Sequence, residues 1–475
     1  MGEGGQGRGD ARRLTAVTGG ADARGVTRAL ADFVVAARYD HIGAAVRHEA
    51  ARSLVNWMGC ALGGAHHETL DAALAALLPF AGPPQAGLIG RGERLDAPNA
   101  ALLNGMSAHV LDFDDTHLRT LLHPSVPVAS SLLALAEYRA LSGAALSGPD
   151  FLHAFIVGVD VECRIANAIY PNHIEQWYIT GTAGVFGAAA AVGRVLGLDA
   201  AGIVRAFGIA GTQAAGLRAM AGTMCKSFVH GRAAQNGMLA AFMAQAGFTS
   251  SERVIEAPRG FAQVLVGDCD PDVMRDVMLD GLGERWEIAL NTYKPHACGV
   301  VCHPVIDGCL ALRNEHGVAP AQIAAVALRV HPLALKLTGI RAPRGGLESK
   351  WSLYHSAAVA LCDGAAGEAQ YTDARVHDPL VTGLRERVTA EAEAELREDE
   401  AHVAVTLVDG RRLDIHIEHT LGSVDNPMSD RDLERKFIGL AGDTLPAGRA
   451  EELLAQCWAI GKLADAAQLA RLAAP

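Results

Sequence analysis

A short stretch with acid, base and hydroxyl side chains, DFDDTHLRTLLHPS, occupies residues 112–125. An imidazole titrates near neutral pH, and a neighbouring carboxylate can orient it as a general acid or base. Asp112 and His123 are therefore predicted to act together in proton transfer. Asp114 and Asp115 are predicted to have capping or structural roles, since aspartate is a common helix cap. The stretch has no HExxH motif or ligand pair at metal-binding spacing, so no metal site is predicted.

A second group of polar residues lies in TMCKSFVHGRAAQNGMLAAFMAQAGF, residues 223–248. Lys226, His230 and Arg232 fall on the first turns of an otherwise apolar predicted helix, and residues four apart share one face. Cations near a buried helix are costly unless an anion meets them. The pattern predicts either an interdomain salt bridge or an anionic substrate, and we favour the substrate. A partly desolvated lysine can also serve as a base.

The stretch QWYITGTAGVFGAAAAVGRVLGLD, residues 176–199, predicts a helix in which glycines allow close packing. Its glycine spacing does not match a nucleotide-binding loop. Thr180 and Thr182 open this helix, where free backbone N–H groups suit a substrate carboxylate. Tyr178 precedes the opening and is predicted to project into the same pocket.

Cys298, Cys302 and His303 lie close together in NTYKPHACGVVCHPVIDG, residues 291–308. A single CxxxCH pattern is weak evidence for a metal, and small buried cysteines are common. His303 and Pro304 instead predict the start of a helix.

Another polar group, Lys350, Tyr354 and His355, borders a predicted apolar helix in GLESKWSLYHSAAVALCDG, residues 346–364. These residues could close over a ligand or line an interdomain interface. The sequence leaves both interpretations open.

The composition narrows the class of protein. Half of the 475 residues are hydrophobic, 5% are aromatic and the formal net charge is −12. The negative charge argues against nucleic acid or an anionic membrane as the main partner. The nine scattered cysteines do not form a disulfide framework and favour a cytoplasmic setting. The alanine- and glycine-rich apolar runs predict buried helices rather than membrane spans.

Hydrophobic periodicity predicts a mainly α protein of two domains. We expect a disordered leader at 1–25, a large all-helical domain at 26–279, an inserted α+β lid domain at 280–425 and C-terminal helices at 426–475 that return to the helical domain. Residues 321–335 alternate like a strand, and 403–420 predict a hairpin that turns at Asp409 and Gly410. The charged run at 389–400 is predicted to be a solvated helix or loop.

Taken together, these motifs resemble the MmgE/PrpD family, which includes 2-methylcitrate dehydratase, cis-aconitate decarboxylase and iminodisuccinate epimerase. The resemblance runs from about residue 31 to about residue 461. It rests on NGMSAHVLDFDDTH…HPS, GTAGVFGAAAAVGRVLGLD, KSFVHGRAAQNG, HPVIDG and GLESKWSLYHSAAVAL. It implies an all-helical domain, a smaller α+β lid, a pocket between them, a homodimer, and no metal or other cofactor.

The resemblance also implies roles for individual residues. Lys226 and His123 would handle protons while Asp112 orients, in a cofactor-independent lyase of the 2-methylcitrate dehydratase type. Such an enzyme removes a proton α to a carboxylate and expels a β-hydroxyl. The predicted binding residues for a small di- or tricarboxylate are Thr116, Thr180, Thr182, His230, Arg232, His303, Tyr354 and His355.

Two departures from the family pattern bear on the reaction. Tyr178 and Ile179 stand where dehydratase and decarboxylase members usually have His-Pro, and Gly299 stands where many members have Arg or His. These changes favour a retuned pocket. The alternatives are therefore an epimerase using Tyr178 and Lys226 as two bases, or a decarboxylase of the cis-aconitate type. A non-catalytic helical binding protein is the remaining possibility.

Overall fold

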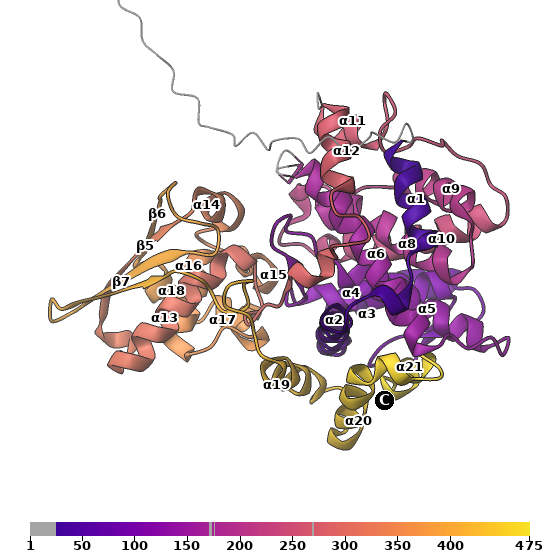
Figure 1. The fold of residues 1–475 in the computed structure, drawn as a ribbon. Helices are drawn as coiled ribbons and strands as arrows, with labels where there is room; N and C mark the ends of the chain where they lie inside the picture. Colours follow the sequence, from indigo (N-terminus) through magenta and orange to yellow (C-terminus); the bar gives the residue numbers. More distant parts are fainter. Residues whose placement is uncertain (1–24, 171–172, 175, 268–269) are drawn as a thin grey trace, which may run out of the picture.

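The computed structural model describes residues 25–170, 173–174, 176–267 and 270–475. The leader predicted for 1–25 lies outside these residues except for Gly25. A large helical part stands beside a smaller part that contains the four-stranded sheet (Figure 1). This arrangement confirms the prediction of a mainly α fold with a smaller α+β domain.

The helical part is formed mainly by the N-terminal half of the chain. Its helices are α1 (Val26–Ala36), α2 (Ala44–Gly64), α3 (Glu68–Leu77), α4 (Ala97–Val110), α5 (Ser125–Ala140), α6 (Gly148–Ile169), α7 (Ile179–Thr182), α8 (Gly184–Val195), α9 (Ala200–Gly211), α10 (Cys225–Gln245), α11 (Phe261–Val266) and α12 (Pro271–Leu279). Side chains that cap the first turn fix where several of these helices begin. The Asp96 carboxylate accepts a hydrogen bond from the Asn99 N–H at α4, and the Ser147 hydroxyl accepts one from the Asp150 N–H at α6.

Small residues let these helices pack closely. A Cβ atom added to Gly158 of α6 would lie 2.7 Å from the carbonyl oxygen of Gly187 in α8. Only glycine permits this approach, because a side chain would collide with the neighbouring backbone. The close packing predicted for residues 176–199 is confirmed here.

The named strands of the described residues form two pairs of two-residue strands and one four-stranded sheet. The short strands are β1 (Ala86–Gly87), which pairs with β2 (Arg94–Leu95), and β3 (Thr116–His117), which pairs with β4 (Asn291–Thr292). The β3–β4 pair brings the 112–125 loop against the segment that leads into the α+β part. It therefore helps to position the site residues on both segments.

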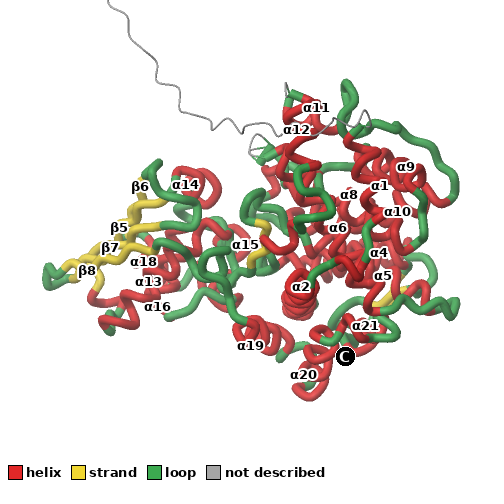
Figure 2. Tube along the Cα trace, viewed as in Figure 1, coloured by secondary structure: helices red, strands yellow, loops and turns green. Residues whose placement is uncertain are grey.

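The four-stranded sheet has the order β6–β5–β7–β8 (Figure 2). Its strands are β5 (Ile323–Val330), β6 (Val388–Ala392), β7 (Ala401–Leu407) and β8 (Arg412–Ile417). The predicted hairpin is confirmed by the antiparallel β7–β8 pair, with Gly410 at φ 88° in the turn. The prediction for 389–400 was wrong in part, since β6 pairs in parallel with β5. Its alternation of small and charged residues suits an edge strand with one exposed face.

The remaining helices of the α+β part are α13 (His303–His316), α14 (Pro332–Thr338), α15 (Gly346–Ser349), α16 (Leu353–Asp363), α17 (Asp373–Val376) and α18 (Pro379–Arg385). The predicted helix start at His303 and Pro304 is confirmed. The predicted strand at 321–335 extends only to Val330, because Pro332 cannot continue the hydrogen-bonding ladder and begins α14.

The C-terminal helices are α19 (Asp430–Ala441), α20 (Ala447–Trp458) and α21 (Ala467–Leu472). α19 and α20 pack against α2, and α21 packs against α5 (Figure 1). The chain end thus lies beside the helical part. Within the described residues, none of the helices combines the length and apolar character needed to span a bilayer.

Candidate active site between the helical and α+β parts

A cavity with an empty volume of about 450 Å³ lies where the two parts meet. The helical part contributes the loop between α4 and α5, the start of α7 and the loop before α10. The α+β side contributes the segment before α13, the end of α14 and the residue after Lys350. The polar and aromatic lining consists of Asp112, Thr116, His123, Tyr178, Thr180, Arg218, Lys294 and Trp351.

The rest of the lining is apolar apart from Gly299. It consists of Leu121, Ile174, Ile179, Val300, Val301 and Leu337. A smaller hollow of about 270 Å³ adjoins Asp112 and Trp351 from another side and is also lined by His109, Lys226 and Lys350. A cavity of about 560 Å³ between α1, α11 and α12 shares no lining residue with either.

Asp112 is the electrostatic centre of the site. Its carboxylate forms ion pairs with Lys226, at 2.9 Å, and with Lys294. The Lys294 ammonium also donates to the Asp112 backbone carbonyl at 3.1 Å. Burial alone would raise the pKa of the Asp112 carboxyl, but Lys226 and Lys294 hold it well below its usual range. Asp112 is therefore a carboxylate at neutral pH.

The backbone at Asp112 is itself unusual. Asp112 has φ 53°, in the left-handed region that non-glycine residues seldom adopt. Such a conformation costs of the order of 1–3 kcal/mol and persists only where surrounding contacts impose it. The bonds from Lys294 to both the side chain and the carbonyl of Asp112 are contacts of this kind.

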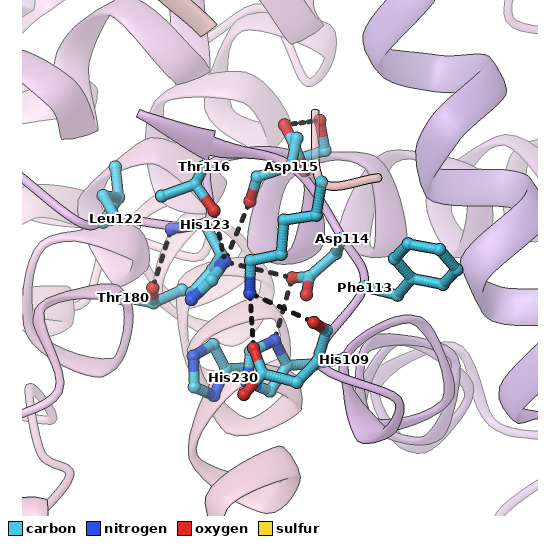
Figure 3. Close-up of polar contacts among 12 residues, drawn as sticks. His109, Phe113, Asp114, Asp115, Thr116, Leu122, His123, Thr180 and His230 are labelled. Atoms are coloured by element: carbon cyan, nitrogen blue, oxygen red, sulfur yellow. Dashed lines mark hydrogen bonds and ion pairs between the residues drawn. The ribbon is translucent and has the colours of Figure 1, made fainter. Parts of the chain in front are cut away.

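His109 links Lys226, a partner of Asp112, to a second acid, Asp114, and Figure 3 shows His109 with Asp114. The Nδ1 atom of His109 lies 2.8 Å from the Asp114 carboxylate, and its Nε2 atom lies 2.7 Å from the Lys226 ammonium. Since an ammonium only donates, His109 Nε2 accepts and His109 Nδ1 carries the proton. Burial, followed by the charge of Lys226, lowers the pKa of His109 well below its usual value. The imidazole is thus neutral.

One ring nitrogen of His123, Nδ1, is hydrogen-bonded within the described residues, and the other, Nε2, is not. Its Nδ1 atom donates to the Asp115 carbonyl at 2.8 Å and lies 3.5 Å from the Asp114 carboxylate. Its backbone N–H donates to the Thr180 hydroxyl at 3.0 Å (Figure 3). Its Nε2 atom makes no hydrogen bond within the described residues. Burial lowers the pKa of His123 well below its usual value, so Nε2 carries a lone pair that can accept a proton.

The acid that contacts His123 differs from the prediction. Asp112 was expected to orient this imidazole, but Asp114 and the Asp115 carbonyl contact it instead. Asp112 faces the lysines because its left-handed backbone turns the carboxylate away from the loop. The carboxylate of Asp115 is used structurally, accepting from Ser125 and Asn291, each at 2.6 Å.

Lys226 is buried and forms an ion pair with the carboxylate of Asp112. Burial lowers the pKa of its ammonium to about 8, against the attraction of Asp112. Lys294 differs, since burial is outweighed by the combined effect of the Asp112 and Asp114 charges and the hydrogen bond to Asp112, which raises its pKa. Lys226 is accordingly the lysine that can exchange a proton near neutral pH, whereas Lys294 remains a fixed cation.

His230 supports the site from behind. Its Nδ1 atom donates to the Lys226 carbonyl at 2.8 Å, one turn back in α10, as their predicted shared face requires. Its ring stacks on His109 with centroids 3.4 Å apart. It does not line the cavity, so its predicted carboxylate-binding role is replaced by a packing contact with His109.

Several other predicted binding residues also lie outside the cavity. Arg232 is exposed and bonds to Gln235, one turn along α10. The Thr182 hydroxyl bonds to His173 at 2.7 Å. Arg232 and Thr182 therefore do not line the cavity, and a role for them in binding a carboxylate stays a prediction.

The binding residues predicted from the α+β part also lie outside the cavity. His303 is buried in the first turn of α13, next to His296. His355 bonds to the Gln370 carbonyl at 2.9 Å, and Tyr354 packs beneath the Arg341 guanidinium. None of the three lines the cavity, since α13 carries His303, and α16 carries Tyr354 and His355, into the α+β core.

The structure adds residues that the sequence reasoning missed: His109, Lys294, Arg218 and Trp351. Their local signals were present but weak. Lys294 stands beside Pro295, and Trp351 directly follows Lys350 in a stretch already under consideration. For Lys294 and Arg218 the available signal was a single basic residue, and only the fold reveals which groups each of them meets.

Three imidazoles, His109, His123 and His230, offer ring nitrogens within 4.8 Å of one another. They have the donor type that binds zinc and related metals. However, the Lys226 ammonium lies 2.7 Å from His109 Nε2 and would repel a cation there. The arrangement therefore fits proton transfer better than metal binding.

The chain belongs to the MmgE/PrpD family. Residues 28–274 match the MmgE/PrpD N-terminal domain, and residues 296–460 match the MmgE/PrpD C-terminal domain. The division between the matches falls in the segment that joins the helical and α+β parts.

Relatives within the family are cis-aconitate decarboxylases. The enzyme of Aspergillus terreus is 27% identical over 472 residues, covering 94% of this chain and 96% of the relative. The enzyme of Mus musculus is 26% identical over 463 residues, covering 94% and 93%. That of Homo sapiens is 26% identical over 449 residues, covering 91% of both chains. The chain is thus similar to lyases along nearly its whole length.

Proposed function

We propose that this protein is a lyase that decarboxylates a small unsaturated di- or tricarboxylate such as cis-aconitate. The observation that carries the proposal is the division of the cavity lining into cationic and apolar side chains. Lys294 in the lining, and Lys226 in the adjoining hollow, both pair with Asp112 and can hold one carboxylate. The apolar residues Val300 and Leu337 disfavour a charged carboxylate beside them and favour its loss as CO₂. The names of the relatives support the same reaction.

The proposed reaction needs a proton donor rather than a metal. The bond between the substrate carbon and its carboxyl carbon breaks, CO₂ leaves, and the electron pair passes into the conjugated unsaturated acid. A carbon of that system then takes a proton from the Lys226 ammonium. Asp112 and His109 hold Lys226 in place, and its lowered pKa suits transfer near neutral pH. Lys294 stabilises the developing enediolate-like charge.

Dehydration is the second candidate, as first predicted from the sequence. It is favoured by one observation, the unbonded Nε2 of neutral His123 at the cavity. This atom would take the α-proton while Lys226 protonates the departing hydroxyl. Epimerisation through Tyr178 and Lys226 is less well supported, because burial raises the pKa of the Tyr178 phenol, which therefore stays protonated at neutral pH and cannot accept a proton.

One experiment separates these reactions. The purified protein is incubated in D₂O with cis-aconitate, citrate, 2-methylcitrate or an aminodicarboxylate and followed by proton NMR. We expect CO₂ release and a product that carries one new C–D bond from cis-aconitate. A new alkene from citrate or 2-methylcitrate without CO₂ would favour dehydration, and deuterium exchange without net conversion would favour epimerisation. If no carboxylate reacts, the proposal is wrong.

The control for this experiment is a lysine variant. Lys226→Ala should abolish turnover, with a loss of roughly 10²–10⁴-fold as expected for a positioned proton donor. Exposed Lys462 provides the matched variant, Lys462→Ala, which should retain full activity. The homodimer, the cytoplasmic location and independence from cofactors remain predictions.

A further inference from the structure

Arg218 is a cation at the cavity without a counter-charge. Its guanidinium lies 4.8 Å from the ring centroid of Tyr178 and 5.2 Å from that of Trp351. In the part of the chain that the structure describes, it forms no ion pair. Arg218 is half-buried, and stacking on two aromatic rings compensates only part of the cost of partly removing a cation from water. The arrangement is therefore expected to bind an anion from outside the chain.

Tyr178 presents a second unused donor in the same cavity. Its side chain is buried, with 4% exposure, and its hydroxyl has no hydrogen-bond partner among the described residues. Buried tyrosine hydroxyls are normally hydrogen-bonded. A ligand oxygen in the cavity would satisfy this hydroxyl and the Arg218 guanidinium together.

The lysines and the arginine at the cavity differ in whether a carboxylate of the chain pairs with them. Lys226 and Lys294 share the carboxylate of Asp112, whereas Arg218 has no carboxylate of its own. Asp112, Arg218 and Lys294 all line the one cavity, together with apolar residues. A ligand with two separated carboxylates would complement both the lysine-bearing side and Arg218.

We propose that Arg218 and the Tyr178 hydroxyl form a second carboxylate-binding subsite that restricts the substrate to molecules carrying at least two carboxylates. This inference rests on the proposed function and specifies the substrate class of the same site. Arg218 binds the carboxylate that is not lost, and the planar guanidinium can hold it through two N–H donors.

Gly299 contributes to the shape of this subsite. A Cβ atom added there would lie 3.6 Å from Trp351 and 3.1 Å from Thr338. A long side chain at position 299 would therefore compete with Trp351 for the space beside Arg218. The resemblance noted above expects Arg or His at this position, and here Arg218 supplies a cation to the same cavity from the helical part.

The test compares two unreactive probes of equal chain length. Glutarate has a carboxylate at each end, and pentanoate has a methyl group in place of one of them. Their affinities are measured by calorimetry or ligand-observed NMR at pH 7, with tricarballylate as a third probe. The variants are Arg218→Gln, Arg218→Lys and Tyr178→Phe. The matched control is Arg47→Gln, since Arg47 also stacks on a tyrosine, Tyr39 at 5.2 Å, but lies outside the cavity.

We expect Arg218→Gln to weaken glutarate binding by about 10- to 100-fold, the range for losing a charge-assisted hydrogen bond, and to leave pentanoate within about twofold. Arg218→Lys should recover part of the loss, Tyr178→Phe should lose a few-fold, and Arg47→Gln should match the wild type. Thermal unfolding without ligand establishes that each variant is folded. If Arg218→Gln does not fold, the Arg218→Lys and Tyr178→Phe results decide.

Two failures are distinguishable. If the wild type binds tricarballylate but the Arg218 and Tyr178 variants keep its preference for glutarate over pentanoate, the subsite is disproved and the proposed function stands. If the wild type binds neither tricarballylate nor glutarate, both the subsite and the proposed function are disproved.

Discussion

At the scale of single residues, the site depends on how the negative charge of Asp112 is shared between its lysine partners. Asp112 is the only carboxylate among the described cavity-lining residues, and two lysines compete for it. Lys226 also bonds to neutral His109, which in turn bonds to Asp114. Burial lowers the pKa of Lys226 to about 8 and Asp112 opposes this effect, so that Lys226 is protonated at neutral pH and can still transfer its proton.

The pKa of Lys226 predicts an alkaline limit to activity. Because burial lowers its folded-state pKa from 10.5 to about 8, the ammonium is present below pH 8 and lost above it. We expect kcat/KM to fall about tenfold per pH unit well above pH 8. The pH profile of kcat/KM measures this.

Lys350 is the control for that assignment, since burial also lowers its pKa to about 8. A Lys350→Gln variant should keep the alkaline limb near pH 8. The assignment to Lys226 would be contradicted if the alkaline limb of the kcat/KM profile shifted in Lys350→Gln but did not shift in the Asp112→Asn variant described next.

Asp112→Asn tests the shared charge directly. Asparagine tolerates the left-handed backbone at this position, so the loop geometry should be kept. Loss of the negative charge should lower the pKa of Lys226 further, since Asp112 is the first group opposing the effect of burial. We expect the alkaline limb to move below pH 8, and an unchanged limb would show that Asp112 does not set the Lys226 pKa.

At the scale of elements, the close approach of α4 and α10 brings His109 to Lys226. Gly231 of α10 makes this approach possible, because a Cβ atom there would lie 2.2 Å from the Leu102 carbonyl oxygen in α4. Gly105 faces it from α4, where an added Cβ atom would lie 2.8 Å from the Gly231 Cα atom. Two glycines thus set the spacing between the helices that carry the network.

Gly231→Ala should therefore separate these helices. We expect a loss of about 1–3 kcal/mol in the free energy of unfolding, the usual cost of overpacking, measured by chemical denaturation. Turnover should also fall, since Lys226 moves away from His109. The matched control is Gly439→Ala at an exposed position of α19, where an added Cβ atom meets nothing within 4 Å. That variant should gain about 0.5–1 kcal/mol; equal effects at the two positions would disprove the packing argument.

At the scale of the whole molecule, lysines join the two parts around the site. The Lys350 ammonium donates to the carbonyls of Leu111 and Ala297, each at 2.7 Å. The Lys436 ammonium, from α19, donates to the carbonyls of Phe113 at 2.6 Å and Lys294 at 2.9 Å. The C-terminal helices thus hold the segments that flank Asp112 and its partner Lys294.

Lys436→Met should weaken this junction. It leaves the Phe113 and Lys294 carbonyls without this donor, and an unsatisfied buried acceptor costs about 1–3 kcal/mol. We expect at least that loss in the free energy of unfolding, together with lower turnover because Lys294 is displaced. Exposed Lys462→Met is the control and should leave both unchanged. Full stability and activity in Lys436→Met would rule out a role for α19 in positioning the site.

The sequence by itself determined the mainly α fold, the hairpin of β7 and β8, and part of the cavity. Asp112, Thr116, His123, Tyr178 and Thr180 line the cavity and Lys226 lines the adjoining hollow, and each lies in a stretch whose local pattern singled it out. Helix period, strand alternation and turn residues act over a few positions, so they can be read from neighbouring residues. The β6 strand was missed because its charged face resembles a solvated loop.

Only the tertiary structure decided which of these residues act together. The ion pairs of Asp112 with Lys226 and Lys294 span 114 and 182 residues of chain. Such pairs depend on helix packing and on the contact between the two parts, which no local pattern records. The same holds for Arg218, Tyr178 and Trp351, which come from separate segments of both parts. Their proximity at one cavity follows from close packing through small residues, and it decides where a carboxylate can bind.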